Sequence, residues 1–285
     1  MGITVAVVAQ GTMGAGVGKR LHERGAAVRT LLSGRSEASA ARAKAAGMQP
    51  APDERALLSG ADYVLSILPP DQAVGLAERL APALQSLAVK PVYVDCNAIS
   101  PQTAQRVAAI VEPTGAAFVD GGIIGGPPRE GYSPAIYASG PEAKRTAALK
   151  EYGIDWRIVD GPVGAASGLK MSYAGITKGT TAIAAAMLLG AARFGCAEAL
   201  IAELRSSQPE MLKRMQRGIP GMYDKAYRWV GEMQEISDFL DANAPSAEMY
   251  RGIARLYDYL AAAEAEDKPA TDNAIRTLDR VLGRP

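Results

Sequence analysis

The sequence predicts an α/β domain with a doubly wound sheet, followed by an all-helical domain. Up to about residue 160, short apolar runs alternate with stretches whose apolar residues recur at helical spacing, which is the pattern of βαβ units with parallel strands. After Gly161 and Pro162 the strand pattern stops, and everything from Val163 onward has helical spacing. We therefore expect a sheet domain over residues 1–161 and a helical domain over residues 162–285.

The elements of the first domain follow from these runs in order. Strands are predicted at residues 3–9, 27–32, 63–68, 92–95, 117–120, 135–138 and 154–159. Helices are predicted between them at residues 13–24, 37–46, 71–80 and 101–111. In the second domain, Tyr223, Tyr227, Val230, Met233 and Leu240 form a stripe that predicts an amphipathic helix.

Composition excludes several classes of function. The 31 basic and 30 acidic side chains nearly cancel, so no basic surface is expected for nucleic acid or for an anionic membrane. Two cysteines and one histidine are too few for a disulfide framework or a Cys/His zinc site, so no metal is expected. The N-terminus lacks a basic signal-peptide region, and the longest apolar run, residues 182–192, is too short to span a bilayer. We expect a cytoplasmic protein with a small-molecule substrate.

The turn after the first predicted strand, residues 8–14, reads VAQGTMG. Dinucleotide-binding turns use one glycine for the tight turn, one for close approach to the pyrophosphate and one for packing the helix on the strand. Gly11 and Gly14 supply the last two, and Ala9 replaces the first, which is tolerated at negative φ. A helix from Thr12 would offer its free N–H groups to the pyrophosphate. This indicates a Rossmann-type cofactor site; the alternative is a glycine-rich turn without a ligand. The predicted cofactor contacts are Gly11, Thr12, Met13 and Gly14.

The end of the second predicted strand selects the cofactor. Sites for NAD usually place an acidic residue there to bind the ribose hydroxyls, but the first acid in this segment is Glu37. Arg35, flanked by Ser33 and Ser36, suits a 2′-phosphate through charge-assisted hydrogen bonds. We therefore predict NADP rather than NAD, with NAD possible; the alternative is an ordinary solvated turn.

Lys170 is a single cation at the start of a long apolar helix, where the sheet domain ends. Oxidising an alcohol requires a base for the hydroxyl proton, and reducing a ketone requires the same group as an acid. A lysine serves both purposes when desolvation brings its pKa to roughly 7–8. The alternative is a lysine that extends its charge into solvent.

Five segments occur in an order and at a spacing that are informative together. They are Gly11–Gly14, Leu68-Pro69, the loop VDCNAISP at 94–101, the segment FVDGGIIGG at 118–126 and the glycine-then-lysine segment at 164–175. Together they resemble the β-hydroxyacid dehydrogenase family, which includes 3-hydroxyisobutyrate and 6-phosphogluconate dehydrogenases. The helical domain resembles a less studied branch, whose short C-terminal domain has no settled function.

The resemblance implies roles for particular residues. Lys170 matches the catalytic lysine, which exchanges a proton with substrate while hydride passes to or from the nicotinamide. Leu68, Pro69 and Asn97 would border the cofactor. The segment at 118–126 would be the substrate loop, where the N–H groups of Gly125 and Gly126 hold a carboxylate. Relatives bury their helical domains against each other, which implies a homodimer.

Departures from the family pattern bear on the substrate. Ile124 stands where the family has a serine, and Tyr173 and Ala174 replace polar residues after the lysine. Lys178, two helical turns beyond Lys170, pairs with an anionic substrate group or is simply solvated. The predicted substrate contacts are Ile124, Gly125, Gly126, Tyr173, Ala174 and Lys178.

We therefore expect an NAD(P)-dependent oxidoreductase acting on a β-hydroxy acid or a related alcohol or carbonyl. The apolar replacements favour a substrate that is larger or less polar than 6-phosphogluconate or hydroxyisobutyrate. One alternative is an imine reductase on the same scaffold, although such enzymes typically lack the lysine. The other is a non-catalytic NADP(H)-binding sensor.

Overall fold

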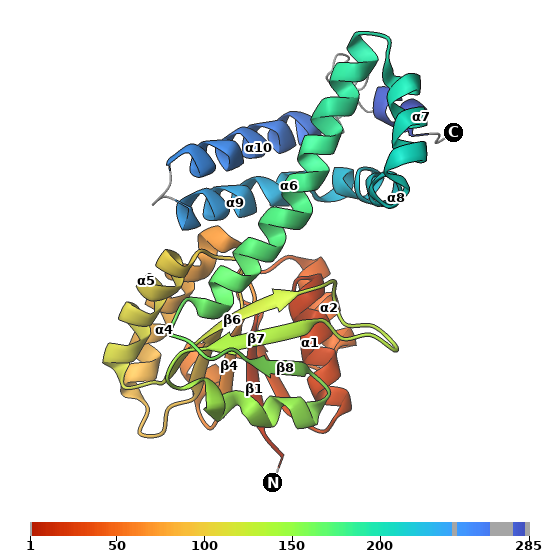
Figure 1. Cartoon of the computed structure of the whole chain (residues 1–285). Helices are drawn as coiled ribbons and strands as arrows, with labels where there is room; N and C mark the ends of the chain where they lie inside the picture. The colour runs from red at the N-terminus through yellow and green to blue at the C-terminus, as the bar shows by residue number, and fades with distance from the viewer. Residues whose placement is uncertain (1, 241–243, 263–275, 283–285) are drawn as a thin grey trace. The chain divides into compact units, whose positions relative to one another are not determined.

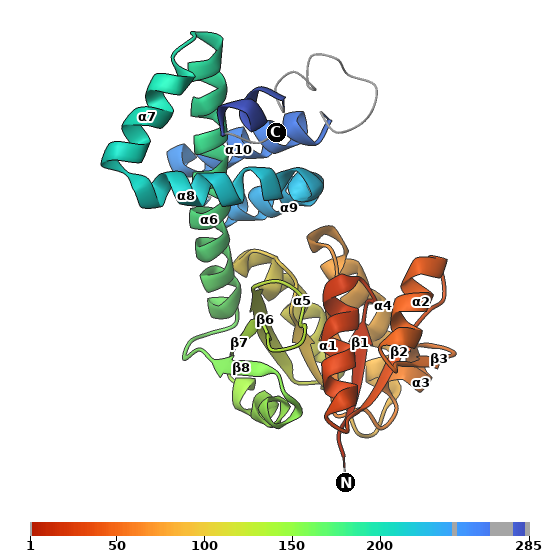
Figure 2. The same cartoon turned by 90° about the vertical axis from the view of Figure 1, so that its right-hand side faces the viewer.

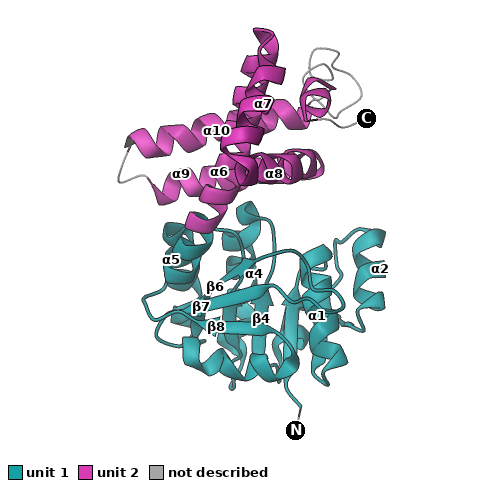
Figure 3. Cartoon of the chain, turned by 45° about the vertical axis from the view of Figure 1, so that its right-hand side comes forward, with its two compact units in different colours: residues 1–171 teal, residues 172–285 magenta. Residues whose placement is uncertain are grey.

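A computed structural model of the chain describes residues 2–240, 244–262 and 276–282. The chain divides into two compact units, Met1–Met171 and Ser172–Pro285, coloured separately in Figure 3. The change from strands to helices falls between Ile158 and Ala165. The long helix α6 (Ala165–Arg193) begins there, so its first turns belong to the first unit and the remainder to the second.

The first unit contains an eight-stranded sheet in the order β3-β2-β1-β4-β5-β6-β7-β8. The strands are β1 (Thr4–Val8), β2 (Ala27–Leu31), β3 (Gln49–Ala51), β4 (Tyr63–Ser66), β5 (Val92–Asp95), β6 (Phe118–Ile124), β7 (Ala135–Ser139) and β8 (Asp155–Ile158). Neighbouring strands are parallel except β6 and β7, which are antiparallel. The doubly wound sheet is confirmed, and the parallel pairing expected of βαβ units holds for every neighbouring pair except β6 and β7. The connection between β6 and β7 is shorter than the crossover that a parallel pair requires.

Helices cover both faces of this sheet (Figures 1 and 2). The helices are α1 (Thr12–Glu23), α2 (Glu37–Ala45), α3 (Glu54–Leu58), α4 (Ala73–Ser86) and α5 (Pro101–Val111), with 3₁₀ segments at Pro70–Gln72, Glu112–Thr114 and Ala143–Tyr152. Alternate residues of β1 divide between two cores: Val5 and Val7 pack with α1 and α2, whereas Ala6 and Val8 pack with α3, α4 and α5. This alternation is what a strand buried on both faces requires.

Two short elements of this unit were not predicted. Strand β3 has three residues, including Pro50, and α3 has five, so neither is long enough to show a periodic pattern. The proline is compatible with β3 because this strand lies at the edge of the sheet.

The second unit is all-helical in the part that the structure describes, as predicted. It contains the rest of α6, then α7 (Ala197–Ser207), α8 (Pro209–Gly218), a 3₁₀ turn at Pro220–Met222, α9 (Tyr223–Phe239) and α10 (Ala244–Ala262). Helices α9 and α10 lie side by side (Figure 1). On α9 the predicted stripe is right for the buried Tyr223 and Met233 but wrong for Tyr227, which is 66% exposed. The buried face of α9 instead continues through Ala226, Ile236 and Ser237.

Candidate active site

The glycine-rich turn lies at the carboxyl end of β1. The chain continues from β1 to β2 on one side of the sheet and later crosses to β4 on the other side. Strand β1 pairs with β2 on one side and with β4 on the other, so this is the topological switch point where open α/β sheets bind ligands. A Cβ at Gly14 would lie 1.8 Å from the carbonyl oxygen of Ala9, so only glycine lets α1 pack this close to β1. Every described non-glycine residue, Ala9 included, has negative φ, which is the condition under which alanine is tolerated there.

The turn also has the donors and the space that an anion needs. Helix α1 begins at Thr12, and no side chain caps its first turn, so the free N–H groups of that turn remain available. A Cβ placed on Gly11 would meet nothing within 4 Å. These residues therefore fit the pyrophosphate of a dinucleotide.

Gln10 and Arg42, neither of which was predicted, hold this turn in place. The Gln10 side chain is fully buried, and its amide nitrogen donates to Thr30 Oγ1 and to the carbonyl oxygen of Leu31. Arg42 Nε on α2 donates to the carbonyl oxygen of Gln10 at 2.8 Å. The turn is thus tied to β2 and α2, a tertiary arrangement with no local motif in the sequence.

One cavity of about 310 Å³ is lined by Arg35 and by Arg79 of α4. The other lining residues are Leu68, Asp71, Gln72, Gly75 and Leu76. Burial, and secondarily the charge of Arg79, lowers the pKa of the Arg35 guanidinium. Arg79 Nε lies 3.4 Å from the carboxylate of Glu54. The positive charges of the two guanidinium groups repel each other, and an anion bound between them would be attracted to both. The cavity therefore fits the 2′-phosphate predicted for Arg35. Arg79 was not predicted, because it follows no strand and belongs to no motif.

The two serines predicted beside Arg35 differ in their surroundings. Ser36 caps α2, where its hydroxyl accepts from the backbone N–H of Ser39. Ser33 is exposed in the turn. The contacts predicted for both with the cofactor stay predictions.

Asn97 links the loops that follow β4 and β5. Its side-chain oxygen accepts from the backbone N–H of Leu68, and its amide donates to Ser66 Oγ at 2.8 Å and to Asp95 Oδ2 at 3.0 Å. Asn97 therefore sets the position of Leu68, and through it the Leu68-Pro69 segment. Its own predicted contact with the cofactor stays a prediction.

Asp95 and Asp120 are buried neighbours in the register of β5 and β6. Burial raises the pKa of Asp95 to about 7, and the charge of Asp120 adds to the effect. Asp120 Oδ2 accepts from the backbone N–H groups of Gly164 and Ser167, both at 3.0 Å, and Oδ1 accepts from Ser167 Oγ. Ser139 Oγ also donates to Asp120 Oδ2 at 2.9 Å. Asp120 thus anchors the N-terminal turn of α6 to the sheet.

Lys170 lies on α6 just beyond this anchored turn. A Cβ at Gly122 on β6 would lie 3.1 Å from Lys170 Cβ and 2.8 Å from the carbonyl oxygen of Ala166. The glycine therefore allows the Lys170 stem to lie directly on β6. Lys170 is half-buried, and no group in the described part of the chain pairs with its ammonium. An unpaired cation held on a rigid element can exchange a proton with a bound substrate.

The loop after β6 holds the predicted carboxylate contacts. Ile124, which ends β6, is half-buried, and Gly125 and Gly126 are exposed. The N–H of Gly126 donates to Tyr132 Oη at 3.2 Å, so a carboxylate would have to displace this hydroxyl. Arg20 on α1 binds the same loop, because its Nη2 donates to the carbonyl oxygen of Arg129 at 2.8 Å.

The remaining predicted substrate residues lie on the part of α6 in the second unit. Tyr173 is 51% exposed, whereas Ala174 is buried. The Lys178 ammonium pairs with the carboxylate of Glu232 and lies 5.1 Å from the centre of the Trp229 ring. Lys178 would have to leave Glu232 to bind a substrate anion. The roles of these three residues stay predictions.

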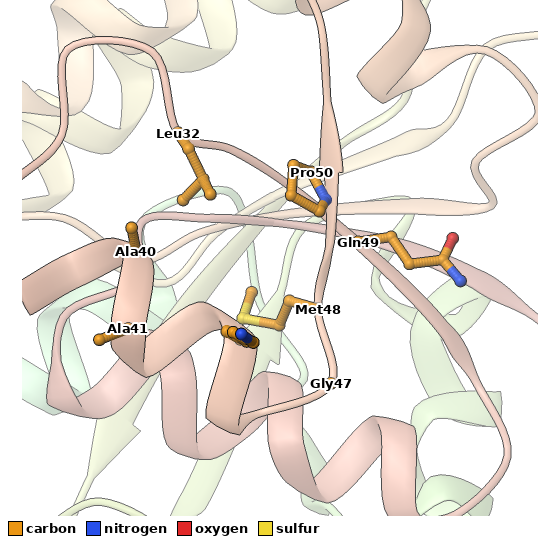
Figure 4. A pocket seen from close by; sticks show the side chains of 8 residues that line it. Leu32, Ala40, Ala41, Gly47, Met48, Gln49 and Pro50 are labelled. Atoms are coloured by element: carbon orange, nitrogen blue, oxygen red, sulfur yellow. The ribbon is translucent and has the colours of Figure 1, made fainter. Parts of the chain in front are cut away.

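A second cavity, of about 570 Å³, lies at the edge of the sheet between α2 and β3 (Figure 4). Its lining includes Leu32, Ala40, Met48 and Pro50, and the Gln49 side chain points away from the others. It lacks the convergent polar groups of a ligand site. No cluster of three possible metal ligands occurs among the residues that the structure describes.

Residues 4–152, more than half of the chain, match the family described as the NAD binding domain of 6-phosphogluconate dehydrogenase. The chain belongs to this family. Its first unit is accordingly an NAD-binding domain of the 6-phosphogluconate dehydrogenase type. Residues 191–260 match a second family, a domain of unknown function designated DUF1932.

The chain is also similar to individual proteins. An uncharacterized 28.5 kDa protein of Methanothermus fervidus is 28% identical over 214 residues, covering 75% of this chain and 81% of the relative. A conserved protein of unknown function, described as structurally similar to 3-hydroxyacid dehydrogenases, is 27% identical with a TM-score of 0.72, over 97% of this chain and 99% of that one. The 3-hydroxyisobutyrate dehydrogenase of Mycobacterium tuberculosis, solved with L-serine, is 20% identical with a TM-score of 0.75, over 98% and 99% of the two chains. Imine reductases share the fold at TM-scores of 0.55 to 0.58.

Proposed function

We propose that this protein is an NADP(H)-dependent oxidoreductase that transfers hydride between nicotinamide and a β-hydroxy acid or a related alcohol or carbonyl, with Lys170 as general acid and base. The observation that carries the proposal is the unpaired ammonium of Lys170. Its stem lies on β6, within the unit that contains the glycine-rich turn.

Separate residues bind the cofactor and transfer the proton. The cofactor, when bound, supplies or accepts the hydride. The first-turn N–H groups of α1 hold its pyrophosphate, and Arg35 and Arg79 hold its 2′-phosphate. Lys170 takes the hydroxyl proton in oxidation and returns it in reduction. Asp120 fixes the helix start, so that the Lys170 amine keeps one position relative to the sheet.

The substrate proposed here is less polar than 6-phosphogluconate. Ile124 supplies an apolar surface where a hydroxyl is usual in the family, and the buried Ala166 and Met171 flank Lys170 on the helix. We also propose that the protein acts as a homodimer, because the exposed surface of α6 in the second unit is apolar.

The proposal is tested by mixing the protein with NADPH or NADH and a panel of β-keto acids, ketones, aldehydes and cyclic imines, and following cofactor absorbance. We expect turnover of a β-keto acid or a related carbonyl, faster with NADPH than with NADH. Turnover restricted to imines would instead identify an imine reductase. Binding of NADPH without turnover of any compound would identify a sensor.

A further inference from the structure

The loop between β6 and β7 places a tyrosine hydroxyl on one of the N–H groups expected to hold a substrate carboxylate. Tyr132 Oη accepts from the backbone N–H of Gly126 at 3.2 Å. Gly125 has a φ of +128°, and a Cβ there would overlap the same hydroxyl, so only glycine admits the tyrosine at this turn. The O–H proton of Tyr132 has no acceptor among the residues that the structure describes. The tyrosine thus takes up a donor of the loop and leaves its own proton unused.

Contacts within the loop and with α1 hold Tyr132 in this position. Arg129 and Tyr132 exchange two backbone hydrogen bonds, each of 3.0 Å. Arg20 Nη2 donates to the carbonyl oxygens of both, at 2.8 Å and 3.2 Å. A Cβ at Gly16 of α1 would lie 2.9 Å from Pro128 Cδ, so the loop lies directly on this helix. The Arg129 guanidinium lies over the Tyr132 ring, 5.3 Å from its centre, and opposes rotation of the ring away from the glycines.

This loop continues the strand on which Lys170 lies. Side chains two residues apart on a strand point to the same face, so Ile124 shares the face of Gly122, where the Lys170 stem rests. Gly125 lies three residues beyond Gly122, about 10 Å along an extended strand. The Lys170 side chain and a small substrate together can span this distance. A substrate that reacts at Lys170 therefore extends its far end over Ile124 toward Tyr132.

The groups that meet this far end suit an uncharged one. Ile124 supplies an apolar surface, and the Tyr132 hydroxyl supplies one neutral donor. A carboxylate loses far more hydration than a carbonyl oxygen does on burial, and it needs several donors or a cation to offset the loss. The Arg20 guanidinium already donates to backbone carbonyls, and the Arg129 guanidinium lies on the Tyr132 ring. A ketone, ester or amide oxygen needs only the single proton that Tyr132 has left.

We propose that Tyr132 closes the carboxylate subsite of this loop, and that the substrate is an uncharged carbonyl compound or alcohol whose far end accepts a hydrogen bond from the Tyr132 hydroxyl. The inference rests on the proposed function and narrows its substrate class to the uncharged members. Tyr132 is then a specificity-determining residue, separate from the proton transfer at Lys170.

The test compares compounds that differ only in charge: acetoacetate and its longer straight-chain homologues, each beside its methyl ester and its primary amide. With NADPH and the full-length protein, kcat/KM is expected to be at least about tenfold higher for the ester and the amide than for the acid.

Two substitutions separate closure of the subsite from donation by the hydroxyl. Tyr132→Ala removes the whole side chain and exposes the Gly126 N–H, so kcat/KM for the acid is expected to rise at least about tenfold, through a lower KM. Tyr132→Phe keeps the ring and removes only the donor, so the ester is expected to lose about fivefold while the acid stays within about twofold. Tyr152→Phe is the matched control, because that hydroxyl accepts from the Ile3 N–H at the amino end of β1, and it should change neither value.

Binding distinguishes failure of this inference from failure of the proposed reaction. Calorimetry in the presence of NADP⁺ compares the β-hydroxy acid of the same skeleton with its methyl ester. Binding of the ester by the wild type, and of the acid by Tyr132→Ala, would support the inference even without turnover, and the redox function alone would then fail. Wild-type protein that uses or binds the acid as well as the ester, or that binds neither, would overturn the inference, as would a Tyr132→Ala protein that binds NADPH normally but gains no acid. Should Tyr132→Ala not fold, the wild-type ratio and the loss in Tyr132→Phe decide.

Discussion

Two arginines converge on the cavity that we assign to the adenosine 2′-phosphate. Arg35 follows β2, where a motif in the sequence points to it, but Arg79 comes from the middle of α4. Their mutual repulsion contributes to the lowered pKa of Arg35. A phosphate of charge near −2 between the two arginines would form a favourable ion pair with each of them and outweigh their repulsion.

Arg79→Ala is therefore expected to weaken NADPH binding about tenfold or more, as for loss of one charge-assisted hydrogen bond, and to leave NADH binding unchanged. Titration of cofactor fluorescence measures both affinities. Arg55→Ala, an exposed arginine on the neighbouring α3, is the matched control and should change neither. An equal loss for NADH and NADPH would show that Arg79 is not a phosphate ligand.

Asp95 gives the protein a specific dependence of stability on pH. Its pKa is raised by burial to about 7 in the folded chain, against about 4 in an unfolded one. Between these values the folded state holds a proton that the unfolded state has lost, so raising the pH through this window lowers the free energy of unfolding. The stability that the Asp95 proton contributes is fully present below about pH 4 and is lost above about pH 7, where the free energy of unfolding no longer changes through Asp95.

Asp95→Asn removes the titrating group. We expect urea denaturation to show that the stability of the wild type, relative to this variant, falls between about pH 4 and about pH 7. The slope approaches about 1.4 kcal/mol per pH unit for one proton. A stability difference that rises with pH would mean that the Asp95 pKa is lowered rather than raised by the fold.

At the scale of the element, α6 owes its starting point to a strand far away in sequence. Asp120 on β6 accepts hydrogen bonds from the first turn of the helix, including the backbone N–H groups of Gly164 and Ser167. The carboxylate thus works as a helix cap supplied by the sheet, and its charge favours the helix N-terminus. Since Lys170 follows on the same helix, Asp120 is a positioning residue for it.

Asp120→Asn is expected to destabilise the first unit by about 2 kcal/mol or more. An asparagine has only one side-chain oxygen, so its NH₂ group would replace one of the oxygens that accept hydrogen bonds from the start of α6. Hydrogen exchange in peptides covering residues 163–170 should also become faster. Asp155→Asn is the control, because Asp155 forms an exposed ion pair with Arg157 and should cost less than about 1 kcal/mol. Equal losses in the two variants, with no change in exchange, would contradict the capping role.

At the scale of the whole molecule, periodicity was enough to predict the class of fold. The buried strands β1, β4 and β5 are long enough to show as apolar runs, and α6 to α10 show helical spacing. Local sequence has no information about β3, which has three residues and gains its place only by pairing with β2. The antiparallel direction of β7 depends on a loop rather than on the strand's own composition.

Some residues of the candidate site could likewise be predicted from local motifs, and others could not. Gly14 and Arg35 stand beside strand ends, so motifs identify them. Arg79 acts on Arg35, and Asp120 acts on the first turn of α6; each of these pairs is separated by 44 positions or more, so no short window of sequence contains both members. Lys178 shows the reverse case, because its position on the helix left a substrate contact and a solvated side chain open, whereas the fold pairs it with Glu232.

The central claim is that Lys170 carries the proton, and one variant tests it most directly. Lys170→Met keeps the length of the side chain and removes the amine, so NADPH should bind with unchanged affinity while kcat for the best carbonyl substrate falls at least about 100-fold. Lys144→Met, at an exposed lysine of the same unit, should keep full activity. Turnover by Lys170→Met within a few-fold of wild type would contradict the account.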